Sequence, residues 1–332
     1  MKTSTRHHAP IRRAAAVAVA ATALALTGCA GAAAGATPEP TTAEFPLVAD
    51  NCGFEVTVDA PPDRIVTIKS STLELLLALG VEDRVIAYAF PDGPVPDELA
   101  AAAGGIPQLA EKLPSQEALL ALEPDLVFAG WESNLTAEGV GERATLDRLD
   151  VGTYVAPSAC KGEGYMPDPL TFDGVFADFV ETGRIVGADA AAAALVEQQR
   201  AELAAIEPDG RGLTALWYSS GKDTPFVGAG IGAPQMLMAA AGLDNVFADI
   251  HDTWSSVSWE AIADQDPDVI VLVDADWNTA ESKVAFLESH PVTSKLSAVQ
   301  AGRYLVVDFP ATEAGVRNVA AVSALVAQLN GL

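Results

Sequence analysis

Two stretches of the chain repeat one pattern and decide the expected fold: residues 115–127 read SQEALLALEPDLV, and residues 258–270 read SWEAIADQDPDVI. Each begins with a Ser-x-Glu helix start and ends on Pro-Asp followed by an apolar strand. The serine and the proline are nine residues apart in both copies, and the copies lie 143 residues apart. A repeat of this long period predicts two similar lobes; chance similarity between two helix–turn–strand units is the alternative.

Helix-like and strand-like segments alternate around these units. A weaker echo pairs residues 74–80 (ELLLALG) with residues 236–242 (MLMAAAG). The first half predicts strands at 64–68, 85–88 and 125–129, with helices at 73–79 and 116–122. Such alternation favours an α/β fold of two Rossmann-like lobes, each with a largely parallel sheet, and a ligand cleft between them.

The segment between the repeats predicts a helical connection. Apolar residues recur at helical spacing over residues 172–180, before Gly183 and Gly187 interrupt the pattern and a second helix follows at 188–206. We therefore expect a first lobe at 49–168, a stiff connecting helix at 169–188, and a second lobe at 189–332. A helical spine restricts how far two lobes can hinge.

The N-terminus has the features of an export signal. A basic start precedes the apolar run 14–27, which is too short to cross a bilayer. The run closes on Leu-Thr-Gly-Cys, which resembles the bacterial lipobox; this resemblance implies that Cys29 is lipidated after removal of residues 1–28. An ordinary secretory signal with a chance cysteine is the alternative. Residues 29–48, rich in Ala, Gly, Thr and Pro, are expected to form a tether.

The composition limits the partners. The leader carries four of the basic residues, so the mature chain has 15 Lys and Arg residues against 45 acidic ones. A body this acidic repels nucleic acid, so none is expected as a partner. With Cys29 set aside, Cys52 and Cys160 form an even pair in an oxidising compartment, which favours a disulfide over two buried thiols.

Several motifs together resemble a known family. They are Asn51-Cys52-Gly53 ahead of residues 62–66 (PDRIV), the doubled Ser-x-Glu…Pro-Asp units, and residues 180–187 (VETGRIVG). The chain resembles the helix-spined binding proteins of bacterial ABC importers, which handle ferric siderophores, haem and cobalamin, over residues 51–329. Within that family it looks similar to a branch proposed to carry a deazaflavin coenzyme precursor.

The resemblance implies roles for two exposed acids. In this family one glutamate per lobe, at the helix start in Ser-x-Glu, docks on arginines of the permease, and Glu117 and Glu260 hold these positions. Both could instead serve only as helix-start acids favoured by the helix dipole. The resemblance implies further partners: a small-molecule ligand, the ABC permease and, through the lipid, the membrane. We expect a monomer outside the cell membrane that is no enzyme.

Ligand contacts are expected in the loops that follow the strands of both lobes. The candidates are Lys69, Ser70, Ser71, Tyr88, Lys112, Trp131, Trp217, Tyr218, Lys222, Gly230, Trp254, Trp277 and Arg317. Three of the six lysines of the mature chain are among them, which points to an anionic ligand, although a lone lysine is more often a solvated surface charge. Four of the five tryptophans lie in or near such loops, which suits a conjugated ligand, although tryptophans can also pin loops to the core.

Other chemistries have weaker support. Residues 228–233 (GAGIGA) imitate a dinucleotide fingerprint, but an exported chain meets little nicotinamide cofactor, so the glycines are expected at most to hold an anionic ligand group. No nucleophile elbow occurs, and the mature chain has only His251 and His290, too few for a bare zinc or manganese site. No cofactor is expected. A lipid-anchored extracellular enzyme on the same scaffold is the rival hypothesis.

Overall fold

The structure is a computed structural model that describes residues 44–166 and 168–332. The expected signal peptide, Cys29 and most of the expected tether lie outside the described residues. None of the helices in the described ranges has both the length and the apolar character needed to cross a bilayer.

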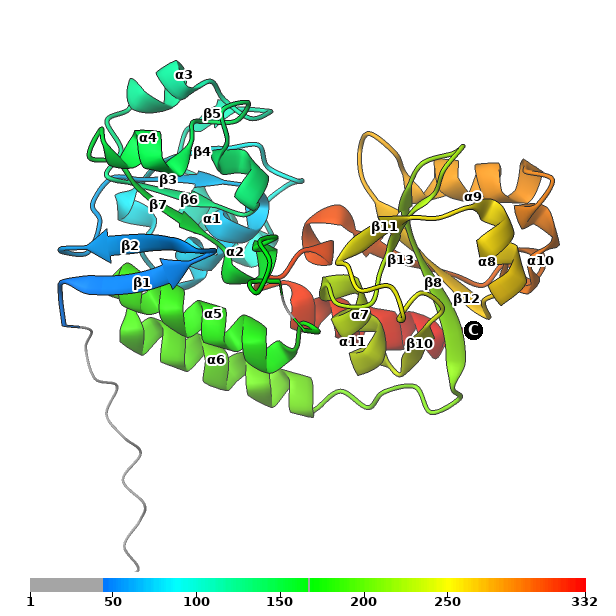
Figure 1. Ribbon diagram of the computed structural model, residues 1–332. Coiled ribbons are helices and arrows are strands. Elements are labelled where there is room, and N and C mark those ends of the chain that lie inside the picture. The colour runs from blue at the N-terminus through cyan, green and yellow to red at the C-terminus, as the bar shows by residue number, and fades with distance from the viewer. Residues whose placement is uncertain (1–43, 167) are drawn as a thin grey trace, which may run out of the picture. The chain divides into compact units, whose positions relative to one another are not determined.

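The first lobe is built on a five-stranded parallel sheet with strand order β5-β4-β3-β6-β7 (Figure 1). Its strands are β3 (Ile65–Ile68), β4 (Val85–Ala89), β5 (Gln108–Ala110), β6 (Leu126–Ala129) and β7 (Gly152–Val155). Its helices are α1 (Ser70–Ala78), α2 (Asp97–Ala103), α3 (Gln116–Leu120) and α4 (Arg143–Asp147), with 3-10 turns η1 (Glu82–Arg84), η2 (Glu132–Leu135) and η3 (Pro157–Ala159). The strands predicted at 64–68, 85–88 and 125–129 are confirmed as β3, β4 and β6.

The second lobe repeats this plan, but its sheet has an added strand and antiparallel strands at one edge. Its sheet has the order β11-β9-β8-β12-β13, with β10 added beside β8, and β9 runs antiparallel to β8. The strands are β8 (Leu213–Ser220), β9 (Phe226–Gly228), β10 (Leu243–Asn245), β11 (Trp254–Ser256), β12 (Val269–Asp274) and β13 (Tyr304–Asp308). The helical segments are α7 (Ala233–Ala241), α8 (Trp259–Gln265), α9 (Ala280–Ser289), η4 (Thr293–Lys295), α10 (Ser297–Ala301), η5 (Phe309–Thr312) and α11 (Asn318–Leu329).

The repeated sequence units occupy equivalent places in the two lobes. In each, the serine side chain caps a helix (Ser115 for α3, Ser258 for α8), and the strand after Pro-Asp pairs with the central strand. The aspartates of the two units also make equivalent hydrogen bonds. Asp125 accepts from the backbone N–H of Arg64 at 3.0 Å, and Asp268 accepts from that of Thr214 at 3.0 Å. Each therefore fixes the start of its lobe's central strand.

A hairpin of β1 (Leu47–Asn51) and β2 (Phe54–Val58) precedes the first sheet. Asn51 is buried and ties the hairpin to β7, since its side chain donates to the carbonyl of Val155 and accepts from the N–H of that residue, both at 2.8 Å. Cys52, in the hairpin turn, forms the predicted disulfide with Cys160. The hairpin thus begins at Leu47, two residues before the expected start of the first lobe.

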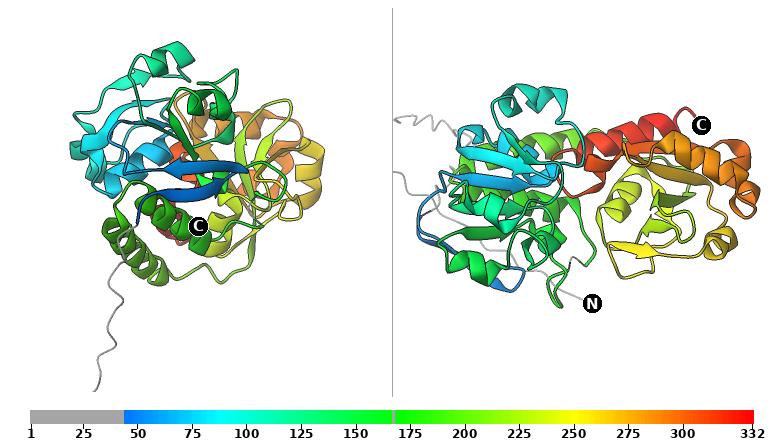
Figure 2. Two further views of the ribbon diagram at one scale, coloured as in Figure 1. Left: turned by 60° about the vertical axis from the view of Figure 1, so that its left-hand side comes forward. Right: turned by 90° about the horizontal axis from the view of Figure 1, so that it is seen from above.

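The connection between the lobes differs from the prediction. The helix α5 (Phe172–Ile185) was expected to join the lobes, yet its apolar face, including Val175, Phe176 and Phe179, packs into the core below the first sheet. The helix α6 (Asp189–Ala204) then runs back along α5 and leads into β8 (Figures 1 and 2). The last helix before the second lobe is therefore α6.

Gly183 does not interrupt α5. It lies inside the helix, where a β-carbon would meet that of Ala192 at 2.4 Å, so glycine permits the close approach of α5 and α6. The chain reverses at Gly187, whose φ of +65° favours glycine.

The apolar core is continuous between the lobes. One cluster of buried side chains combines α1 and α5 with α7, β12 and α11, while two further clusters cover the other faces of the two sheets. Arg317, at the start of α11, also pairs with the buried Glu74 of α1 at 2.5 Å and donates to the carbonyl of Pro94 at 2.7 Å. The two lobes therefore share one continuous apolar core, and the Arg317–Glu74 ion pair links them.

Candidate ligand-binding cleft

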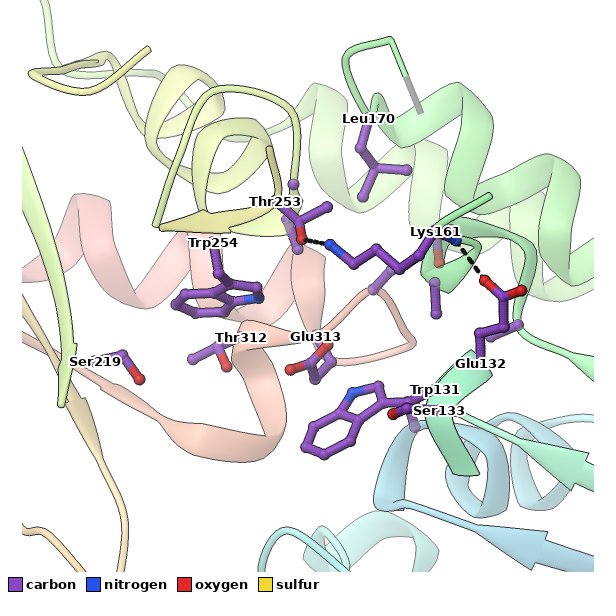
Figure 3. A pocket seen from close by; sticks show the side chains of 18 of the residues that line it. Trp131, Glu132, Ser133, Lys161, Leu170, Ser219, Thr253, Trp254, Thr312 and Glu313 are labelled. Carbon is purple, nitrogen blue, oxygen red and sulfur yellow. Dashed lines mark hydrogen bonds between the residues drawn. The ribbon is translucent and has the colours of Figure 1, made fainter. Parts of the chain in front are cut away.

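A cavity of about 810 Å³ lies between the lobes, at the carboxyl ends of their strands (Figure 3). The first lobe contributes the loops after β6 and β7, and the second contributes the ends of β8 and β9, residues 252–254, Trp277 and the segment after β13. Loops at the carboxyl ends of parallel strands are the usual place of ligand sites in open α/β sheets, and the volume suits a ligand of drug-like size or somewhat larger.

Aromatic rings form much of the wall, and each is supported by a second ring. Trp131 packs edge-on against Phe90 at 5.8 Å, and Trp277 packs edge-on against Phe309 at 5.9 Å. Trp254 stacks on Phe226, with ring centres 5.8 Å apart and planes 14° apart. The lining offers flat apolar surface from both lobes, which suits a ligand with flat or apolar faces of its own.

Four charged residues line the cavity: Glu132, Lys161, Asp252 and Glu313. Lys161 follows the disulfide in the first lobe, and its ammonium reaches Asp252 of the second lobe at 3.1 Å and also donates to the Thr253 hydroxyl. The backbone N–H of Lys161 donates to the Glu132 carboxylate at 2.6 Å. The single lysine among the lining residues is therefore already paired across the cleft.

Glu313 follows η5 and points toward the centre of the cavity, near Trp131 (Figure 3). Burial, together with the negative charge of Asp92, raises the pKa of Glu313 to about 7, while Lys69 and the Trp131 indole act in the opposite direction. No ion pair forms at this carboxylate among the described residues.

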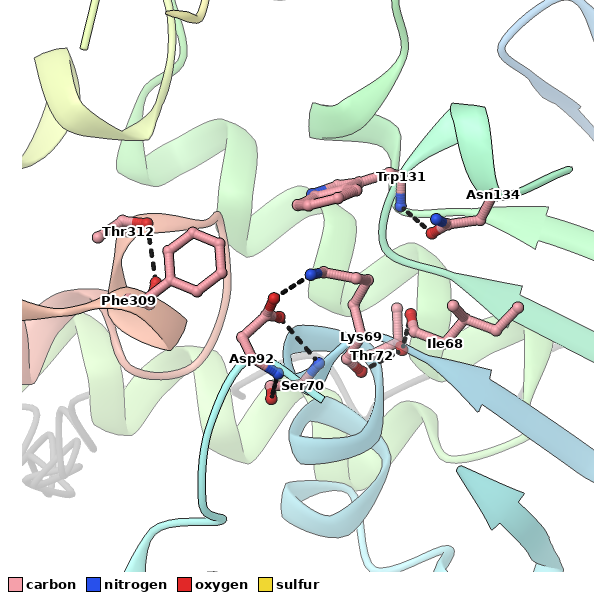
Figure 4. A network of polar contacts seen from close by, with 9 residues as sticks. All are labelled: Ile68, Lys69, Ser70, Thr72, Asp92, Trp131, Asn134, Phe309 and Thr312. Carbon is pink, nitrogen blue, oxygen red and sulfur yellow. Dashed lines mark hydrogen bonds and ion pairs between the residues drawn. The ribbon is translucent and has the colours of Figure 1, made fainter. Parts of the chain in front are cut away.

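Lys69 lies beneath the cavity floor, contrary to the expectation that it contacts the ligand (Figure 4). Its side chain is 1% exposed and pairs with Asp92, which is equally buried. Its ammonium lies 3.7 Å from the Trp131 ring centre and 4.2 Å from that of Phe90. Lys69 therefore supports the aromatic floor from below.

The lining includes four of the predicted ligand residues: Ser71, Trp131, Trp254 and Trp277. Ser70 is buried beside Asp92, with which it exchanges hydrogen bonds at 2.8 and 3.2 Å. Arg317 is engaged by Glu74, as described above. The remaining predicted contacts do not line the cavity: Tyr88, Lys112, Trp217, Tyr218, Lys222 and Gly230.

Four of the predicted residues that miss the cavity lie either in the core or at the solvent-exposed surface. Trp217 and Tyr218 lie within β8 and belong to the core, because this strand runs on to Ser220 and the cavity begins at Ser219. Lys112 and Lys222 are exposed to solvent. None of the three lysines that pointed to an anionic ligand lines the cavity, so these residues do not support an anionic ligand.

The glycine segment also differs from the expectation. The N–H groups of Ala229, Gly230 and Ile231 donate to carbonyls of residues 250–253, at 2.9–3.2 Å. A β-carbon on Gly230 would lie 1.9 Å from the Ala248 carbonyl oxygen. These amides are thus used within the lobe and are not free to hold an anionic ligand group, and β9 before them is antiparallel, unlike the first strand of a dinucleotide-binding unit.

Glu117 and Glu260 are both exposed, each in the first turn of its helix. They lie outside the cavity lining, on equivalent helices of the two lobes. This placement leaves both carboxylates accessible from solvent.

Several residues that line the cavity were not among the predicted ligand contacts. The most important are Lys161, Asp252, Thr253, Phe309 and Glu313. Phe309 could have been found, since it directly follows the last strand. Glu313 lies beyond a four-residue 3-10 turn, and Lys161 is placed by the disulfide beside it. No group of three or more His, Cys, Asp or Glu side chains in the described ranges is arranged to hold a metal ion.

Comparison with known proteins agrees with this geometry. Residues 65–311 match the family model described as periplasmic binding protein. A cobalamin-binding protein of Halobacterium salinarum is 29% identical over 280 residues, covering 80% of this chain and 68% of its own. An uncharacterised ABC transporter substrate-binding lipoprotein of Bacillus subtilis is 25% identical over 279 residues, covering 80% of this chain and 79% of its own.

A solved structure is similar over a wider span. The structure of an ABC-type Fe3+-hydroxamate transport system from Saccharomonospora viridis has a TM-score of 0.73 and 28% sequence identity. The match covers 86% of this chain and 99% of the other. These relatives are named as binding or transport proteins.

Proposed function

The chain belongs to the periplasmic binding protein family, and from this premise we propose that it is the lipid-anchored substrate-binding protein of an ABC importer. We further propose that it captures a ferric hydroxamate siderophore. The observation that carries the ligand proposal is the aromatic cleft whose one lining lysine is already paired.

The charge of the cleft favours a complex without net negative charge. Three hydroxamate groups lose one proton each on chelation, so they neutralise Fe3+ and leave an uncharged core. A tris-catecholate complex keeps three negative charges. In the cleft it would meet Glu132, Asp252 and Glu313, and the described lining offers no free cation to offset them. The similarity to an Fe3+-hydroxamate transport system of Saccharomonospora viridis supports the same choice.

A deazaflavin coenzyme precursor is the second candidate. The indoles of Trp131, Trp254 and Trp277 would suit its planar ring system. Its acidic groups fit the cleft less well, because Lys161 would first have to leave Asp252.

Titration of the purified protein separates these ligands. Since three of the five tryptophans line the cavity, binding should quench tryptophan fluorescence. A ferric trihydroxamate is expected to bind with a Kd of about 1 µM or less, and a ferric tris-catecholate at least about tenfold more weakly. Tighter binding of the catecholate would refute the charge argument, and tight binding of the deazaflavin precursor alone would replace the siderophore.

The lipid anchor is tested separately. In cells, Cys29→Ala should move the protein from the membrane fraction to the soluble extracytoplasmic fraction, because the thioether that carries the lipid cannot form. Quantitative immunoblotting of the fractions measures this shift. The same comparison is made without the disulfide, between the variants Cys52→Ser Cys160→Ser and Cys29→Ala Cys52→Ser Cys160→Ser. Retention of Cys29→Ala in membranes would rule out anchoring through this residue.

A further inference from the structure

The charged side chains of the cleft differ in how they are satisfied. Glu132 accepts from the Lys161 backbone at 2.6 Å, while Asp252 accepts from the Lys161 ammonium at 3.1 Å and from the Thr253 N–H at 2.6 Å. Glu313 also lines the cavity, but it has no ion pair among the described residues. Glu132 has no ion pair either, but a backbone N–H holds it, whereas the Glu313 carboxylate has the Trp131 indole as its partner. The charge of Glu313 is thus buried in the cavity without a counter-ion among the described residues.

The charges around Glu313 do not remove this imbalance. Lys69 and Asp92 approach it from the first lobe, but they pair with each other and together are neutral. Lys161 also attracts the Glu313 carboxylate, yet its ammonium is engaged by Asp252 and Thr253. A carboxylate in an apolar pocket either takes up a proton or binds a cation, because an isolated buried charge is costly.

The molecule already contains one ammonium in similar surroundings. The Lys69 ammonium contacts the Asp92 carboxylate and lies within 4.2 Å of the ring centres of Phe90 and Trp131. Trp131 borders the cavity whereas Lys69 does not, and Glu313 lies beside the same indole (Figures 3 and 4). A carboxylate thus lies next to aromatic rings in two places. Below the cavity floor, Asp92 is paired with the Lys69 ammonium; within the cavity, Glu313 has no such ammonium beside it in the part of the chain that the structure describes.

We propose that Glu313 and Trp131 form a subsite for a positively charged amino group on the ligand. The carboxylate would accept hydrogen bonds from the ammonium, and the aromatic rings would add cation–π attraction. This inference rests on the proposed function and narrows it: among ferric hydroxamates, those with a free amino arm are selected over those without one.

The selection should depend on pH in one direction. The pKa of Glu313 lies at about 7, so the carboxylate is mostly ionised at pH 8 and mostly protonated at pH 6. Lowering the pH through 7 removes the negative charge that attracts the amino arm. The preference for the amino-bearing ligand is therefore expected at pH 8 and should decline toward pH 6.

The first experiment compares two linear ferric trihydroxamates that differ only at one end, where one has a primary amine and the other its N-acetyl derivative. Wild-type protein should bind the amine form about tenfold more tightly at pH 8, the effect of one charge-assisted contact, and clearly less selectively at pH 6. Glu313→Gln should bind both forms alike at both pH values. Glu281→Gln is the control, because this exposed glutamate lies outside the cavity lining, and it should keep the preference.

The variant is suited to this comparison. Gln has nearly the shape of Glu, and the backbone carbonyl of residue 313 still accepts from the Asn318 side chain, at 2.8 Å in the wild-type protein. Equal binding of the two chelates by wild-type protein, or a preference that persists in Glu313→Gln, would overturn the subsite while leaving the siderophore proposal intact.

A second experiment does not depend on the siderophore. The probes are 2-phenylethylammonium and its uncharged counterpart 2-phenylethanol, followed by the NMR signal of the Trp131 indole N–H, which is assigned by its loss in Trp131→Phe. The ammonium should shift this signal in wild-type protein at pH 8 and not in Glu313→Gln, and the alcohol should have little effect on either. If the chelates fail to bind while this pattern appears, the subsite stands and the hydroxamate proposal falls. Equal shifts from both probes, or none from the ammonium, would refute the subsite.

Discussion

Replacing both Glu117 and Glu260 with alanine is expected to reduce import through the cognate permease by roughly 10–30-fold while ligand affinity stays within a few-fold of wild type. The expectation rests on the proposal that each carboxylate pairs with a permease arginine. One such exposed ion pair would contribute up to about 1 kcal/mol, and two together correspond to about that loss. The effect on binding is small because both residues lie outside the cavity lining.

The two positions are suited to joint recognition of a two-fold-symmetric partner. Glu117 and Glu260 occupy the first turns of α3 and α8, and each helix is capped by the serine two residues earlier, Ser115 or Ser258. Either single replacement should therefore cause an intermediate defect of about threefold to fivefold, since the other lobe still docks.

The matched control is the double replacement Glu98→Ala Glu281→Ala. These are also exposed glutamates in first helical turns, of α2 and α9, but they lie outside the repeated units. Import by this variant should remain near wild type. Normal import by the Glu117→Ala Glu260→Ala protein, or an equal defect in the control, would refute docking through these positions.

Removal of the disulfide should cause the second large effect. Cys52 and Cys160 are 108 residues apart, and closing a loop of this length stabilises the folded state by about 4–5 kcal/mol in the chain-entropy model. The variant Cys52→Ser Cys160→Ser should accordingly lose about this much free energy of unfolding, measured by urea denaturation.

The cysteine variants also carry an internal control. A reductant should lower the stability of wild-type protein toward that of the double variant and leave the double variant unchanged. Labelling of unreduced, unfolded protein should find neither Cys52 nor Cys160 reactive. Reactivity of both residues, or equal stability of the two proteins, would contradict a bridge in the exported protein.

Much of the fold could be predicted because the local sequence pattern in each repeated unit matches the helix and strand that the unit forms. The Ser-x-Glu…Pro-Asp units mark equivalent helices and strands, because serine caps the helix and aspartate fixes the neighbouring strand in each lobe. The connection was less predictable. Residues 172–180 show helical spacing whether the helix bridges two lobes or covers one, and only the packing of Phe176 and Phe179 decides between these arrangements.

The site was predictable only in part, because the position of a residue after a strand does not say which way its side chain points. Trp131, Trp254 and Trp277 line the cavity as expected, but Lys69 turns beneath the floor to pair with Asp92, which is 23 residues away in the sequence. Lys161 and Glu313 reach the cleft through a disulfide and a short 3-10 turn, respectively, and neither feature has a local sequence signal that indicates a ligand contact.

The most direct test of the ligand proposal is a native mass spectrum of the protein purified from its own host grown with limiting iron. Capture of a ferric hydroxamate in the cleft predicts one bound small molecule per chain, with the iron isotope pattern and a mass that matches a trihydroxamate recovered by extraction. The molecule should be lost from a Trp131→Ala Trp254→Ala variant, because both indoles form the cavity wall. A bound molecule without iron, or one retained by this variant, would contradict the account.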